Sequence, residues 1–188
     1  MITAILLAAG QSSRTGSKNK LLLSYKKKKL IQHAIQNILK SNVDDILVVL
    51  GKNKDQIKKV LPKKKIIRTF YNKHYKSGMS SSIKLGIKHL SKKTTHFFIC
   101  LADMPNIKAS HYKKMLKASI KQQDVPIVSF YQARQMNPVL FPYSFHQKLK
   151  KIQGDIGAKN ILKKTEIVKI KVLKSSFFKD LDTVEDFN

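Results

Sequence analysis

The stretch that decides the fold is residues 2–23, ITAILLAAGQSSRTGSKNKLLL. Residues 2–9 are almost all apolar, which is typical of a short strand buried on both faces of a sheet. The run stops at Gly10, and small residues, Arg14 and several lysines follow. Small residues let backbone amides approach an anion closely. We therefore expect a strand that leads into an anion-binding loop.

The same alternation continues along the chain. Short apolar runs predict strands over residues 3–7, 45–50, 66–70, 96–101 and 126–130. Amphipathic patterns between them predict helices over residues 30–40, 55–61, 80–90 and 110–121. Beyond residue 130 we expect short strands over 138–141 and 167–173 and helices over 145–152 and 156–162. This order predicts one α/β domain over residues 1–188, with a mainly parallel sheet that has one antiparallel strand.

The net charge of +27 comes almost entirely from lysine, because the only arginines are Arg14, Arg68 and Arg134. Proteins that read bases favour the arginine fork, so diffuse lysine indicates a solvated surface and no specific nucleic-acid partner. A basic nucleic-acid-binding protein stays open as an alternative of another class.

No apolar run approaches the roughly 20 residues that cross a bilayer. With Cys100 as the single cysteine, no internal disulfide is possible, and we expect a cytoplasmic protein without a signal peptide.

Ligands of open α/β sheets bind at the carboxyl ends of the strands. The loops of this chain that are rich in small or charged residues directly follow predicted strands. In the first loop, Gly10 and Gly16 are six residues apart, so neither a Walker A motif nor a dinucleotide fingerprint is present. Arg14 and Lys20 are placed to contact a triphosphate, the first as a fork and the second as a point charge. The alternative is an exposed loop whose charges have no ligand.

Two groups of carboxylates are candidates for a metal. Asp103 follows the fourth predicted strand, where it either binds Mg²⁺ against phosphate oxygens or caps a turn. Asp182 belongs to the acidic segment 180–186, where it either binds the metal or caps a last helical turn. The six histidines have no metal-ligand spacing, and no serine has the context of a hydrolase nucleophile.

Six motifs occur in an order that resembles the MobA-like nucleotidyltransferases, and within them the molybdenum cofactor cytidylyltransferases. They are LLAAGQSSRTGSKNKLLL, NKHYKSGMSSSI, LADMPNI, NPVLF, GDIGAK and DLDTVEDF, and together they extend over essentially the whole chain. Three positions depart from the family pattern: Thr15 stands where methionine is usual, Asn137 where a glycine is expected, and Lys159 where an arginine is common.

The resemblance implies a Rossmann-like three-layer α/β/α sandwich and Mg²⁺-dependent nucleotidyl transfer. The implied reaction joins CTP to a molybdopterin-type cofactor, releases pyrophosphate and supplies a molybdenum hydroxylase. It assigns catalysis to Arg14, Lys20 and Asp103 and metal binding to Asp103. The acidic segment offers Asp182 as a second metal ligand, with Asp180 as the alternative. The implied nucleotide-binding residues are Ala8, Ala9, Gly10, Ser12, Ser13, Arg14, Lys20, Asn72, Gly78, Ser80 and Ser82.

The motif GDIGAK opens the predicted helix 156–162, whose free amides form an anion site. We therefore expect Gly154, Asp155 and Gly157 to help place the acceptor, unless Asp155 is only the N-cap of that helix. Three alternatives stay open: a guanylyltransferase of the molybdenum cofactor, a sugar-phosphate nucleotidyltransferase of the same fold, and a nonenzymatic cofactor carrier.

Overall fold

The computed structural model describes residues 1–10, 19–155 and 157–172. Its main sheet has seven strands in the order β5-β4-β1-β6-β8-β7-β9. Their bounds are β1 (Ile2–Ala8), β4 (Asp45–Leu50), β5 (Ile67–Tyr71), β6 (His96–Leu101), β7 (Ile127–Tyr131), β8 (Arg134–Pro142) and β9 (Val168–Lys171). β8 pairs antiparallel with β6 and β7, and the other pairs in this sheet are parallel. The prediction of a mainly parallel sheet with one antiparallel strand is confirmed.

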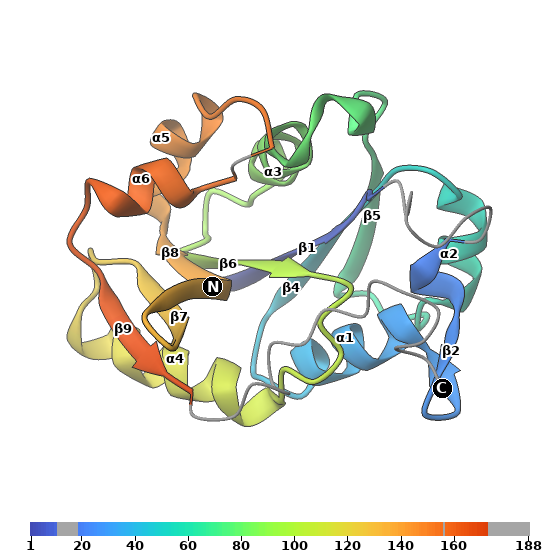
Figure 1. The fold of residues 1–188 in the computed structure, drawn as a ribbon, viewed down its shortest axis with the longest axis horizontal. Helices are drawn as coiled ribbons and strands as arrows, with labels where there is room; N and C mark the ends of the chain where they lie inside the picture. Colours follow the sequence, from blue (N-terminus) through green and yellow to red (C-terminus); the bar gives the residue numbers. More distant parts are fainter. Residues whose placement is uncertain (11–18, 156, 173–188) are drawn as a thin grey trace.

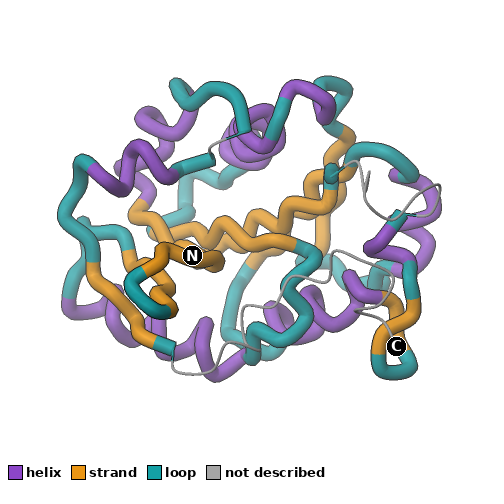
Figure 2. The backbone as a smooth tube through the Cα atoms, viewed as in Figure 1, coloured by secondary structure: helices purple, strands orange, loops and turns teal. Residues whose placement is uncertain are grey.

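Helices cover both faces of the sheet, so the molecule has three layers (Figure 1). On one face lie α1 (Leu30–Leu39), α2 (Lys54–Val60) and α4 (Ala109–Lys121). On the other lie α3 (Met79–Lys88), α5 (His146–Lys150) and α6 (Lys159–Lys163). Figure 2 shows the strands as the middle layer between the helices. The predicted three-layer α/β/α sandwich is confirmed.

The central strands form because their residues are apolar on both faces. All six residues of β4 are buried, and six of the seven residues of β1 are buried. Helix α1 buries one stripe (Leu30, Ile31, Ala34, Ile35, Ile38) against this sheet. On the opposite face, α3 lies very close to β1, because a Cβ on Gly86 would come within 2.4 Å of Ile5 Cγ2. The first turn of α3 supplies Met79 and Ser82 to the wall of the cavity described below.

Some elements differ from those predicted. The helix predicted over 156–162 begins only at Lys159, because Gly157 has a left-handed φ of +61° that no helix accommodates. Strand β8 is longer than predicted, since it continues through a bulge at Asn137 and Pro138. The lysine run 26–29 belongs to a small hairpin: Lys26 and Lys27, both with positive φ, form the turn between β2 (Ser24–Tyr25) and β3 (Lys28–Lys29).

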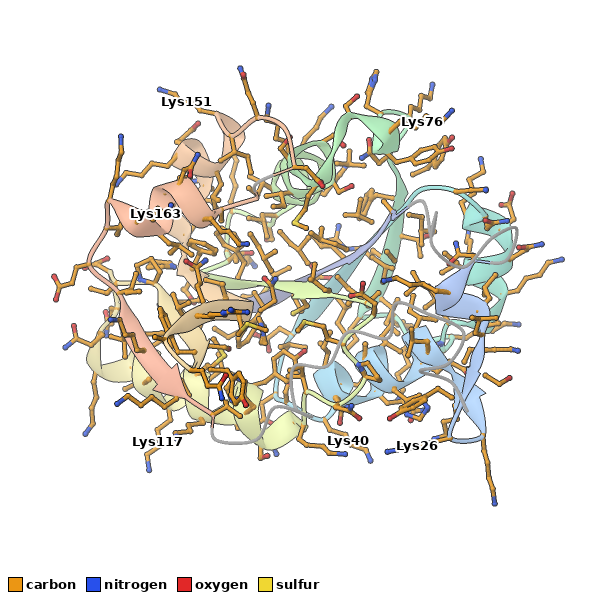
Figure 3. The ribbon with its side chains drawn as sticks, in the orientation of Figure 1. Lys26, Lys40, Lys76, Lys117, Lys151 and Lys163 are labelled. Carbon is orange, nitrogen blue, oxygen red and sulfur yellow. The ribbon has the colours of Figure 1, made fainter. Side chains whose placement is uncertain are left out.

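Lysines of the described residues lie on several sides of the molecule (Figure 3). Figure 3 shows lysines of the loops and of both helical layers pointing outward around the molecule, among them Lys26, Lys40, Lys76, Lys117, Lys151 and Lys163. Within the described residues, no helix combines the length and the apolar character that a bilayer crossing needs.

Candidate nucleotide-binding site

A cavity of about 550 Å³ opens at the carboxyl ends of β1 and β6. The strand order reverses at this point: from β1 the chain adds β4 and β5 on one side of β1, and it then adds β6 on the other side. Such switch points are where open α/β sheets bind their ligands. The cavity is lined by Leu7, Ala8, Ala9, Gly10, Lys20, Leu21, Tyr75, Lys76, Ser77, Gly78, Met79, Ser82, Leu101, Asp103, Gly154 and Asp155.

Lys20 and Asp103, which are 83 positions apart in sequence, form an ion pair in this cavity. Lys20 Nζ donates to Asp103 Oδ2 at 2.6 Å, and both side chains are mostly buried, with exposures of 15% and 22%. Lys20 begins the short 3-10 helix η2 (Lys20–Leu22), which Asn19 caps through its side-chain oxygen on Leu21 N. Asp103 is held near β1, because Ala102 N donates to Leu7 O at 3.1 Å.

The second oxygen of Asp103 fits a metal. Oδ1 is buried and accepts no hydrogen bond from the part of the chain that the structure describes. A buried carboxylate oxygen without a donor is unfavourable unless a cation binds it. Mg²⁺ prefers such oxygens and is usually held by one or two carboxylates together with substrate phosphates. Among the described residues no group of three or more His, Cys, Asp or Glu side chains surrounds a metal position. The donor set therefore suits Mg²⁺ bound jointly with a phosphate ligand.

The loop between β5 and α3 is held by Asn72. Its Nδ2 donates to Ser81 Oγ at 2.8 Å and to Ser82 Oγ at 3.0 Å, while its Oδ1 accepts from His74 N at 2.9 Å. Asn72 is buried and lies behind the cavity, whereas Ser82 and Gly78 line it. Ser80 lines a shallow groove beside it, together with Asn72. In this structure Asn72 shapes the cavity wall through its neighbours.

The GDIGAK segment packs against the start of α3. Asp155 Oδ1 accepts from Met79 N at 2.8 Å, and Gly154 O accepts from Ser80 N at 3.1 Å. Gly78 has a φ of +88°, and a Cβ there would come within 2.8 Å of Gly154 O. Asp155 thus supplies a cap to a helix that begins 76 residues earlier, not to its own. The sequence predicted that Asp155 places the acceptor or caps the helix 156–162, and neither prediction included this contact with α3.

A second cavity of about 260 Å³ adjoins the first and shares Met79, Leu101 and Asp155 with it. Its remaining walls are mostly apolar, and their residues are Ile83, Ile99, Met104, Gln135, Met136, Asn137, Val139, Phe141, Gly157, Ala158 and Lys159. Gly157 allows the walls to close, since a Cβ there would contact Met79 Sδ at 3.1 Å.

The structure brings nine of the predicted site residues to the first cavity: Ala8, Ala9, Gly10, Lys20, Gly78, Ser82, Asp103, Gly154 and Asp155. Ser12, Ser13, Arg14 and Asp182 lie outside the described residues. Sequence reasoning did not single out Tyr75, Lys76 or Met79, although the motif NKHYKSGMSSSI contains them.

Comparison with known proteins defines the class. Residues 4–169 match the MobA-like NTP transferase domain, and the chain belongs to this family. Nicotine blue oxidoreductase of Paenarthrobacter nicotinovorans is 26% identical over 98% of this chain and 93% of that protein.

Two solved structures share the fold over nearly the whole chain. Rv0371c of Mycobacterium tuberculosis H37Rv superposes with a TM-score of 0.87 at 19% identity, over 99% of this chain and 95% of that chain. A nucleotidyl transferase from Methanothermobacter thermautotroptrophicus superposes with a TM-score of 0.84 at 18% identity, over 100% and 94% of the two chains. These likenesses confirm the Rossmann-like fold.

Proposed function

We propose that this member of the MobA-like family uses Mg²⁺ and CTP and transfers the cytidylyl group to a terminal phosphate of a molybdopterin-type cofactor, with release of pyrophosphate. The observation that carries the proposal is the Lys20–Asp103 pair at the strand switch point, with one oxygen of Asp103 buried and without a donor. The choice of CTP and of this acceptor rests on the motifs GDIGAK and DLDTVEDF, which resemble those of the cytidylyltransferase branch.

The reaction joins two anions, so positioning and charge neutralisation dominate its catalysis. The acceptor's phosphate oxygen attacks the α-phosphorus of CTP and forms a new P–O bond, while the bond to the β-phosphate oxygen breaks and pyrophosphate leaves. The attacking phosphate is already ionised at neutral pH, so the protein needs no general base. This agrees with a cavity lining that contains no histidine among the described residues.

Each proposed residue has a distinct role. Lys20 offsets negative charge that develops on the α-phosphate and the leaving group. Asp103, with Asp182 as second ligand, would hold Mg²⁺, which would supply positive charge to lower the repulsion between the two anionic substrates. Arg14 contacts the phosphates as a fork, and backbone amides of the first loop, from Ala9 to Ser13, cradle them.

The remaining nucleotide and acceptor contacts are proposed from the cavity walls. Gly78 and Ser82 face the base and ribose; Asn72 supports Ser82 through its hydrogen bond, and Ser80 contributes from the neighbouring groove. Gly154 lines the first cavity, Gly157 the second and Asp155 both, and we assign these three residues to the acceptor. The proposal also includes a cytoplasmic location and a molybdenum hydroxylase as recipient of the product.

The name of the relative from Paenarthrobacter describes an oxidoreductase, and our proposal departs from it. A dinucleotide fingerprint requires two glycines separated by a single residue, and no such pair occurs in this sequence. Within the family, guanylyl transfer to the same cofactor and nucleotidyl transfer to a sugar phosphate are the competing reactions.

One assay separates these reactions. The protein is incubated with Mg²⁺, molybdenum cofactor and one of CTP, GTP, ATP or UTP, and pyrophosphate is measured. We expect release with CTP alone. Release with GTP alone would favour the guanylyl reaction, and release only when a hexose phosphate replaces the cofactor would favour the sugar reaction. No release with any combination would refute the proposal.

A further inference from the structure

Strand β8 carries a bulge beside the second cavity. In the β7–β8 ladder Val128 pairs with Val139, but the next residue, Ser129, pairs with Met136. Asn137 and Pro138 are therefore two extra residues in β8. Bulges of this kind redirect a side chain and are frequent beside functional sites.

A chain of buried polar groups fixes this bulge from behind. The hydroxyl of Ser129 donates to Pro138 O at 2.8 Å, and Ser129 Oγ lies 2.8 Å from His111 Nε2. Pro138 O can only accept, so with the Ser129 proton on Pro138 O the Nε2–H tautomer of His111 donates to Ser129 Oγ; Met115 Sδ, at 3.6 Å, is the other acceptor within reach of Ser129. Ser129 is fully buried and His111, on α4, is 6% exposed. Burial, with a smaller effect of Lys114, lowers the pKa of His111 to about 4, so its imidazole is neutral at neutral pH.

This arrangement places Asn137 in the wall of the second cavity. The amide of Asn137 makes no hydrogen bond within the described residues, whereas the amide of the buried Asn72 is fully used. Apart from the shared Asp155, the other polar side chains of this wall are Gln135 and Lys159. Most of the rest is aliphatic, aromatic or methionine.

We propose that Asn137 selects the acceptor and that the buried His111–Ser129 pair positions Asn137. The inference rests on the proposed function, because it assigns the second cavity to the body of the molecule that receives the nucleotidyl group. A side-chain amide offers one donor edge and one acceptor oxygen, so it matches a ring with an N–H beside a C=O. A sugar would leave several hydroxyls against apolar walls, which is unfavourable.

Kinetics of variants test the assignment. Asn137→Leu keeps the size of the side chain and removes its hydrogen bonds, and we expect the KM for the acceptor to rise about tenfold, the usual effect of one lost hydrogen bond at the upper end. The KM for CTP should not change. An unchanged acceptor KM in an enzyme that still turns over would overturn the proposal and leave the proposed function intact.

The positioning role has its own variants. Ser129→Ala and His111→Leu release the bulge and should raise the acceptor KM about fivefold. His111→Gln keeps an N–H donor at similar reach and should restore the wild-type value. The matched control is Ser119→Ala on α4, the helix of His111, because Ser119 is also buried, at 5% exposure, but within the described residues its hydroxyl donates only to Leu116 O in the same helix. Equal effects of Ser119→Ala and Ser129→Ala would contradict a specific role of the His111–Ser129 pair.

A second readout does not depend on turnover. The side-chain amide signal of Asn137 in an NMR spectrum, identified by its loss in Asn137→Leu, is followed while molybdenum cofactor, free pterin or a hexose phosphate is added to the CTP-bound protein. We expect a shift with cofactor or pterin, reduced in Ser129→Ala. If no acceptor supports pyrophosphate release, the proposed function fails, and this shift alone decides the inference. The absence of a shift with every probe, or a shift with hexose phosphate alone, would overturn it.

Discussion

We expect mild acid to destabilise the fold through one buried side chain, His111. In the folded protein its pKa is lowered from 6.5 to about 4, first by burial and then by Lys114. The neutral ring donates through Nε2 to Ser129, inside the layer between α4 and the sheet. The folded state therefore binds fewer protons here than the unfolded state as the pH falls.

The sign and size follow from linkage. A group whose pKa is lower in the folded state favours unfolding once the pH falls below its unfolded value. With pKa values of 6.5 unfolded and about 4 folded, the free energy of unfolding decreases by about 2 kcal/mol between pH 7 and pH 5 and by about 3 kcal/mol at pH 4. The contribution is fully present above pH 6.5 and is lost progressively down to pH 4.

The assay is urea unfolding followed by circular dichroism, since the chain has no tryptophan. Wild type and His111→Gln are compared at several pH values between 7 and 4. His89 and His96, whose pKa values burial also lowers, are present in both proteins, so their effects cancel in the difference. The variant should lose about 2 kcal/mol less than wild type between pH 7 and pH 5. Parallel pH profiles would refute a buried, neutral His111.

Three further substitutions have defined outcomes. Lys20→Ala should lower the rate of pyrophosphate release by roughly two to three orders of magnitude, as expected for a lost transition-state stabiliser, and near-wild-type turnover would exclude that role. Asp155→Ala should lower the unfolding free energy by about 1 kcal/mol in denaturant titrations, because Met79 N loses its cap, while Asp155→Asn keeps most of it. Gly86→Ala should destabilise by about 1–3 kcal/mol, because its Cβ would overlap Ile5, and an unchanged melting temperature would contradict the close packing of α3 on β1.

The strand pattern could be read from the sequence because buried parallel strands are continuous apolar runs. The predicted strands 45–50 and 96–101 coincide with β4 and β6, and 3–7 lies within β1. Strand β8 was predicted only over 138–141, because the polar residues that precede Pro138 do not alternate and the bulge interrupts the period of two. The helix predicted over 156–162 began three residues too early, since periodicity does not report the positive φ of Gly157.

The candidate site likewise combines residues that the sequence indicated with contacts that it did not. Lys20 and Asp103 could be proposed from the sequence, and expected near each other, because both follow predicted strands and parallel strands bring the loops after them to one edge of the sheet. Their direct contact, and the cap that Asp155 gives α3, join residues 83 and 76 positions apart. Contacts between residues so far apart in sequence depend on how the layers pack, so no local sequence pattern predicts them. The relay from His111 through Ser129 to Pro138 was missed for the same reason.

The most direct test of nucleotidyl transfer is the fate of radiolabelled phosphorus in CTP. With Mg²⁺ and molybdenum cofactor present, label at the α-phosphate should appear in the cofactor product, and label at the γ-phosphate should appear in pyrophosphate. Asp103→Asn, which removes the carboxylate that fits the metal, should abolish both transfers. Label from the γ-phosphate on the acceptor, or equal transfer by wild type and Asp103→Asn, would contradict the account.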